Sequence, residues 1–142
     1  MRPDGPPIGL QLATAQKAVG RAFNEALAEV GGTFPIWLIL SSLKANERRT
    51  QLELAQAVGI EGPTLTRHLD GLERAGLVLR VRDPQDRRAV RVELTAAGES
   101  LYAKLLTAVI AFNRQLTEGI GEQELRRFRR TLDRLRENAA RQ

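Results

Sequence analysis

The chain has 142 residues, of which 42% are hydrophobic and 27% are charged, a balance typical of one folded domain. It has no cysteine and one histidine, His68, which excludes a disulfide scaffold, a thiol nucleophile and a histidine-rich metal site. The net charge of +5 favours an anionic partner, most commonly nucleic acid. The longest apolar run, residues 34–40, is far shorter than the roughly 20 residues that span a bilayer, so we expect a soluble, cytoplasmic protein without metal or cofactor.

Helical periodicity begins near the N-terminus. Apolar residues recur every three or four positions over 8–30, which predicts a helix with one apolar stripe. Gly31 is placed to end that helix. Thr33 can cap a second helix over 34–44, with Pro35 in its first turn. This second helix is apolar nearly all round and is therefore expected in the core.

Two short helices follow a polar break at residues 46–49. Thr50 and Glu53 have the spacing of a capping box, which predicts a helix over 51–58. A three-residue turn that contains glycine leads to another helix over 62–75. Two short helices joined by such a turn are typical of a helix-turn-helix motif.

Periodicity changes from helical to period-two directly after the helix-turn-helix. Residues 77–82 and 90–94 alternate between apolar and polar, which predicts two strands. The charged, turn-rich residues 83–88 join them into a hairpin. The sequence thus predicts a mainly α fold with a small β-hairpin wing, which is a winged helix-turn-helix over residues 33–95.

The last third predicts two further helices, over 96–118 and 122–139, the first capped by Thr95. The final helix carries apolar residues at alternating spacings of three and four, the seam of a coiled coil. These residues are Leu125, Phe128, Leu132 and Leu135. Together with Leu12 and Val19 of the first helix, they would expose a large apolar area in a monomer. We therefore expect residues 8–30 and 97–142 to be dimerisation helices that flank the winged lobe within one domain, 1–142.

The helix over 62–75 has the features of a DNA recognition helix. Its leucines share one side, whereas Arg67, Asp70 and Arg74 lie opposite. Thr64 and Thr66 flank the N-terminal end, which such a helix places at base edges in the major groove. Arginine can read guanine, and threonine suits phosphate or the thymine methyl group. The alternative is that Arg67 is an ordinary solvated arginine.

The hairpin region contains five arginines between residues 80 and 91. Because neighbouring side chains in a hairpin leave on opposite faces, we expect Arg87 and Arg88 to have different roles. Arg87 is predicted to enter the minor groove, and Arg88 to reach back to Asp70. Asp86 is the second residue expected to brace the wing. Two alternatives remain: an ordinary charged turn, or the reverse assignment of the two arginines.

Aromatic residues suggest a small-molecule pocket where the first two helices meet the fifth. The candidates are Phe23, Trp37 and Tyr102, although aromatic residues are most often simply core. Salicylate-like anions are expected to bind there and quench Trp37. The arginines of the last helix either solvate its outer face or contact phosphate. These are Arg126, Arg127, Arg129, Arg130, Arg134 and Arg136.

Three segments carry a resemblance to a known family: TLTRHLDGLERAGLV (64–78), DPQDRRA (83–89) and LTAAG (94–98). In these segments, and in the order of its elements, the chain resembles the MarR family of bacterial transcriptional regulators. The resemblance implies an obligate homodimer, a pseudo-palindromic DNA operator and release by a small aromatic or phenolic anion. Family members that sense peroxide use a cysteine, which this chain does not have.

We therefore expect a homodimeric DNA-binding repressor without enzymatic activity, since no recognisable catalytic constellation is present. The DNA-binding residues would be Thr64, Thr66, Arg67, Arg74, Arg87 and Arg88. The alternative is a winged-helix interaction module that dimerises without specific DNA binding. The two arginines in the wing argue against that alternative.

Overall fold

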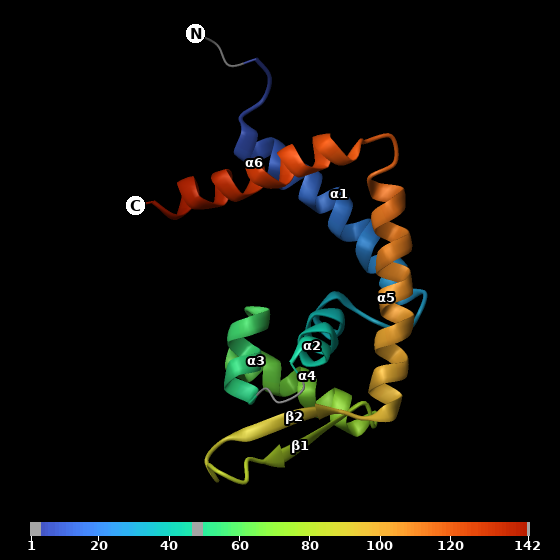
Figure 1. The fold of residues 1–142 in the computed structure, drawn as a ribbon, viewed down its shortest axis with the longest axis vertical. Coiled ribbons are helices and arrows are strands. Elements are labelled where there is room, and N and C mark those ends of the chain that lie inside the picture. The colour runs from blue at the N-terminus through green and yellow to red at the C-terminus, as the bar shows by residue number, and fades with distance from the viewer. Residues whose placement is uncertain (1–3, 47–49, 142) are drawn as a thin grey trace. The chain divides into compact units, whose positions relative to one another are not determined.

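The computed structural model describes residues 4–46 and 50–141, which form six helices and one antiparallel hairpin (Figure 1). The elements are α1 (Ile8–Ala28), α2 (Phe34–Ala45), α3 (Gln51–Val58), α4 (Gly62–Arg74), β1 (Val78–Arg82), β2 (Val90–Leu94), α5 (Ala96–Leu116) and α6 (Glu122–Ala140). This confirms the predicted fold class. The chain divides into two compact units, Met1–Ile110 and Ala111–Gln142, which we describe separately.

In the first unit, the predicted capping residues and glycine lie at the ends of the helices. Gly31 has a positive φ of 86° just after α1. The Thr33 hydroxyl accepts the N–H of Ile36 at 3.3 Å and caps α2. Thr50 accepts the N–H of Glu53 at 3.1 Å, while the Glu53 carboxylate accepts the N–H of Thr50, so the predicted capping box is present. Of the predicted polar break, residues 47–49 lie outside the described residues.

The wing is a two-stranded antiparallel sheet. Its register pairs Val78 with Leu94 and Arg82 with Val90. In β2, Val92 points inward and is fully buried, as the alternation predicts. In β1 the fully buried residue is Val78, whereas the apolar Leu79 and Val81 are exposed. The alternation of β1 thus predicted a strand but not the side that faces the core. The tip is closed by the N–H of Asp83, which donates to the carbonyl of Ala89 at 2.9 Å.

Leucines from α4 anchor the helix-turn-helix to the core of the first unit. Leu65 and Leu69 are fully buried, and Leu72 nearly so, as the helical spacing predicted. They pack with apolar residues of α1, α2, α3, the hairpin and α5. The buried partners are Leu27, Ile39, Leu40, Leu43, Leu54, Val78, Val92 and Leu105.

A close backbone approach joins the start of α5 to the turn between α4 and β1. The Thr95 N–H donates to the carbonyl of Leu77 at 3.1 Å, and its hydroxyl donates to that of Gly76 at 2.7 Å. A Cβ added to the buried Gly98 would lie 2.1 Å from the Leu77 carbonyl oxygen. Only glycine fits at position 98 without moving backbone.

The second unit contains the end of α5 and the whole of α6. Gly119 has a positive φ of 81° between the two helices, and Glu122 and Glu124 lie in the first turn of α6. The seam residues Leu125, Leu132 and Leu135 are half-buried, and Phe128 is 52% exposed. No residue of α6 is fully buried within the described part of the chain.

Candidate nucleic-acid interface

The recognition-helix candidate, α4, has three distinct sides. Its leucines face the core, and Thr64, Arg67 and Arg74 are exposed, as predicted. A third side contains Thr66, Asp70 and Glu73, which are spaced by four and three residues and so share one face. By helical geometry this third side, which we call the polar flank, lies about 100° from the leucine side. All three residues of the polar flank are half-buried.

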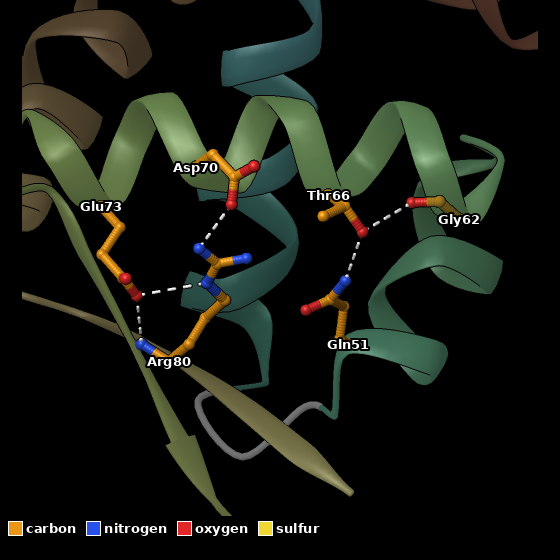
Figure 2. Close-up of polar contacts among 6 residues, drawn as sticks. All are labelled: Gln51, Gly62, Thr66, Asp70, Glu73 and Arg80. Carbon is orange, nitrogen blue, oxygen red and sulfur yellow. Dashed lines mark hydrogen bonds and ion pairs between the residues drawn. The ribbon is translucent and has the colours of Figure 1, made fainter.

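At the N-terminal end of the polar flank, Thr66 is hydrogen-bonded inside the protein (Figure 2). Its hydroxyl donates to the carbonyl of Gly62 at 3.0 Å and accepts the side-chain amide of Gln51 at 2.8 Å. The hydroxyl proton is therefore already used. Thr64 and Arg67, in contrast, are exposed.

Gln51 was not predicted as a site residue. It is the first residue of α3, and its contact ties α3 to α4. A polar, long side chain at the first position of the leading helix is the signal that could have identified it. The contact depends on how two helices cross, which the sequence pattern does not specify.

At the C-terminal end of the polar flank, Arg80 of β1 holds two carboxylates (Figure 2). Its Nη2 lies 2.6 Å from Asp70 Oδ1, and its Nε lies 3.2 Å from Glu73 Oε2. The backbone N–H of Arg80 also donates to Glu73 Oε2 at 3.0 Å. These hydrogen bonds hold the pKa of Glu73 below its ordinary value, and the pKa of Arg80 is raised by Glu73 first and Asp70 second.

The expected pairing of Asp70 with Arg88 is wrong, because Asp70 pairs with Arg80. Asp70 does contact the wing, but its partner is Arg80 on strand β1 and not an arginine at the tip. Arg88 belongs to the turn beyond β1, where its backbone N–H donates to Asp86 Oδ1 at 3.0 Å. Asp86 therefore braces the turn itself.

A second ion pair lies within the hairpin. Arg91 Nε lies 3.1 Å from Asp83 Oδ2. The backbone N–H of Gln85, at 2.9 Å from Asp83 Oδ1, is the main cause that lowers the pKa of Asp83, and the charge of Arg91 adds to it. This pair fixes the base of the turn that presents Arg87.

The remaining arginines of this region are free to meet an anion. Arg67, Arg74, Arg82, Arg87 and Arg88 are exposed, and none forms an ion pair within residues 4–46 and 50–141. The carboxylates of Asp70, Glu73 and Asp83, in contrast, are all paired with arginine. The exposed face of α4 and the tip of the wing are therefore electropositive.

The predicted aromatic pocket is only partly formed. Phe23 lines a cavity of about 240 Å³ between α1 and the start of α2, and its ring packs edge-to-face on Phe34 with centroids 5.8 Å apart. Trp37 and Tyr102 instead stack on each other, with centroids 5.9 Å apart. The other residues that line the cavity are Gln16, Val19, Gly20 and Asn24.

On α6, arginines gather on one exposed side. Arg127, Arg130 and Arg134 line a shallow hollow together with Thr131. Arg136 pairs with Asp133 of its own helix at 3.3 Å. The six arginines of this helix considered in the sequence are all exposed.

Between residues 4–46 and 50–141, no three metal-binding side chains come together. Among the described helices, none is long and apolar enough to cross a membrane.

Comparison with known proteins identifies the class. A sequence model of the MarR family matches residues 33–90. The chain is 35% identical to the transcriptional regulator PA3341, over 96% of this chain and 100% of that chain, with a TM-score of 0.81. It is 34% identical to the transcriptional repressor CouR bound to a 23-mer DNA duplex, over 95% and 93%, with a TM-score of 0.81. A mutant MarR from E. coli complexed with operator DNA is 26% identical, over 91% and 93%, with a TM-score of 0.83.

Fold and site together define a winged-helix, DNA-binding transcriptional regulator. The chain belongs to the MarR family, which is a family of transcriptional regulators and not of enzymes.

Proposed function

We propose that this protein is a homodimeric repressor that binds a pseudo-palindromic DNA operator and has no enzymatic activity. The observation that carries the proposal is the pairing of charges. Asp70 and Glu73 of α4 are paired with Arg80, and Asp83 of the hairpin with Arg91, while the exposed arginines around them have no such partner among the described residues. A surface arranged in this way attracts a polyanion and does not repel it.

Within this proposal, α4 enters the major groove and the wing follows the minor groove. Thr64 and Arg67 reach base edges, and Arg74 contacts phosphate. Arg87 enters the minor groove, with Arg88 beside it at the phosphates. Thr66 contributes through its methyl group and through its contact with Gln51, because its hydroxyl is already bonded.

The proposed dimer depends on apolar side chains that the chain itself leaves uncovered. Leu12, Val19 and Phe128 are exposed, and the other seam residues of α6 are half-buried. A second copy would cover them, in an interface on the order of 2,000 Å² or more. Residues 8–30 and 97–142 then form the dimerisation part, and 33–95 the DNA-binding lobe.

The proposed effector is a small aromatic molecule. Its ring would pack against Phe23 and Phe34, and its polar group would bond the amides of Gln16 and Asn24. Trp37, stacked on Tyr102 in the same unit, serves as the reporter. Phenols and aromatic acids should change its fluorescence in a saturable way and weaken DNA binding. A flat response at millimolar concentration would contradict this part of the proposal.

The test of DNA binding is a gel shift with the duplex that flanks the protein's own gene, at two salt concentrations. We expect a discrete complex that survives competition by random duplex and weakens steeply with salt. A shift abolished equally by random duplex, or no shift at all, would favour the interaction module instead.

A further inference from the structure

We propose that Arg80 is a positioning residue that fixes the rotation of α4 about its own axis and thereby sets the selectivity for the operator. This inference rests on the proposed binding of operator DNA. Arg80 lies on β1, it is engaged with carboxylates, and it is not one of the exposed arginines. Its role would therefore be to aim other residues at the bases.

The leucine side alone does not fix this rotation. Leu65, Leu69 and Leu72 bury α4 along one stripe through contacts that have no direction. The polar flank, at the edge between the buried and exposed sides, is where directional contacts can resist rolling. Hydrogen bonds have this property, because they weaken steeply away from their preferred geometry.

The polar flank is held at both ends by different elements (Figure 2). Gln51 of α3 bonds Thr66 near the N-terminus of α4, and Arg80 of β1 bonds Asp70 and Glu73 toward the C-terminus. Arg80 contributes three donors, its backbone N–H, Nε and Nη2, to two carboxylates. A planar guanidinium can bridge two acceptors in this way, whereas a lysine ammonium acts as a single point charge.

A small roll would be enough to spoil base recognition. Turning a helix by 20° moves a group on its outer surface, about 6 Å from the axis, by about 2 Å. Hydrogen bonds to base edges tolerate only about 0.5 Å in donor–acceptor distance. Phosphate contacts by long, flexible arginines are less sensitive, because their attraction is largely electrostatic and independent of sequence. Loss of Arg80 should therefore reduce selectivity more than general affinity for DNA.

Arg80 also neutralises the two carboxylates, and this effect must be separated from positioning. In Arg80→Gln, Asp70 and Glu73 are left without that partner near the DNA and should repel every duplex. In the triple variant Asp70→Asn, Glu73→Gln, Arg80→Gln, that repulsion is absent, but the bridge is absent as well. The matched control is Arg91→Gln, which breaks the Asp83 pair in the same hairpin without touching α4.

The experiment measures two dissociation constants for each variant: one for the duplex that the wild type selects from a random pool, and one for a scrambled duplex. We expect Arg80→Gln and the triple variant to lower the ratio of selected to scrambled affinity by about tenfold or more, the discrimination of one base contact. The triple variant should recover scrambled binding. The ratio of Arg80→Lys should fall between those of the wild type and Arg80→Gln. Arg91→Gln uncovers the charge of Asp83 and should weaken binding to both duplexes, but its ratio should stay within about threefold of the wild-type ratio.

Three results would overturn the inference. Full recovery of the ratio in the triple variant would assign Arg80 to charge neutralisation alone. A salt slope lower by about one in Arg80→Gln, with the ratio unchanged, would make Arg80 a phosphate contact. An equal loss of the ratio in Arg91→Gln would point to general damage to the wing. If Arg80→Gln does not fold, as judged by circular dichroism, the same comparison is made with Arg80→Lys, and an unchanged ratio there contradicts the proposal. Failure of the wild type to select any duplex would instead contradict the proposed function.

Discussion

Helices α4 and α6 have similar sequences in outline and different surroundings. Both carry a stripe of leucines on one side and arginines on another. In α4 the stripe is closed off by the rest of the first unit, and Leu69 is 0% exposed. In α6 the stripe is open, and Phe128 is 52% exposed. The pattern therefore identifies an amphipathic helix but not the molecule that covers it.

Their charges differ in the same way. On α4, Asp70 and Glu73 are bonded by an arginine from a strand. On α6, Asp133 pairs with Arg136 three residues along the same helix, in an exposed position. The polar side of α4 is set by tertiary contacts, whereas the α6 pair is local and weak.

The largest expected effect is loss of assembly on substitution in the open stripe. Leu132→Glu places a charge where a second copy is expected, so the mass in solution should fall from dimer to monomer. DNA binding should fall by about 100-fold or more, because the two half-sites are no longer bound together. Light scattering and a gel shift check this. Thr131→Glu, next to it on the exposed side, is the control and should remain dimeric. A Leu132→Glu protein that stays dimeric would mean that the seam is not the interface.

The second-largest expected effect is a loss of stability on substitution in the closed stripe of α4. Leu69→Ala leaves a cavity in the core and should lower the free energy of unfolding by about 2–5 kcal/mol, measured by urea denaturation. Leu52→Ala, at a site that is 70% exposed on α3, should change it by less than about 0.5 kcal/mol. Equal losses in the two variants would show that α4 is not held by its leucines.

The third expected effect distinguishes the arginines of the wing from those of α6 by the salt dependence of DNA binding. Arg87→Gln removes an exposed cation from the wing and should lower the salt slope of DNA binding by about one, with folding unchanged. Arg136→Gln on α6 is the control, and its slope should match the wild type. If only the α6 substitution changes the slope, the DNA-binding face has been assigned to the wrong helix.

The smallest effect is the pH dependence that the paired carboxylate confers. Because Arg80 holds the pKa of Glu73 below its ordinary value of 4.5, the ionised form stabilises the folded state above that pH. This stabilisation is lost as the pH falls through the folded pKa. The free energy of unfolding of the wild type should therefore fall more steeply than that of Glu73→Gln between about pH 6 and about pH 3. Parallel curves would show that Glu73 is not held by the pair.

Local sequence signals predicted most of the fold. The capping box of Thr50 and Glu53, the glycine after α1 and the change to period-two alternation placed the elements to within a few residues. Each of these signals depends on interactions between residues close in sequence, so the sequence pattern alone is enough to predict them.

The site was predicted less well, because its contacts join different elements. The sequence showed that Asp70 needs a basic partner but not which arginine would reach it. Arg88 was chosen for its place at the tip, yet the tip lies beyond β1, which alone is five residues or about 16 Å long. Arg80 follows α4 closely, and the spacing of Asp70 and Glu73 fits its fork. The short distance along the chain between Asp70 and Arg80 was thus the signal that the prediction of an Asp70–Arg88 pair did not use.

Gly98 lets the start of α5 lie directly against the turn between α4 and β1. Because the backbone of α5 touches the carbonyl of Leu77 there, and Thr95 bonds the same turn, the first turn of α5 cannot swivel independently of the segment that connects α4 to β1. A displacement of the first turn of α5 is therefore passed directly to the turn before β1, and so to the hairpin. A larger residue at position 98 would collide with the Leu77 carbonyl, so the backbone of α5 or of the segment between α4 and β1 would have to move.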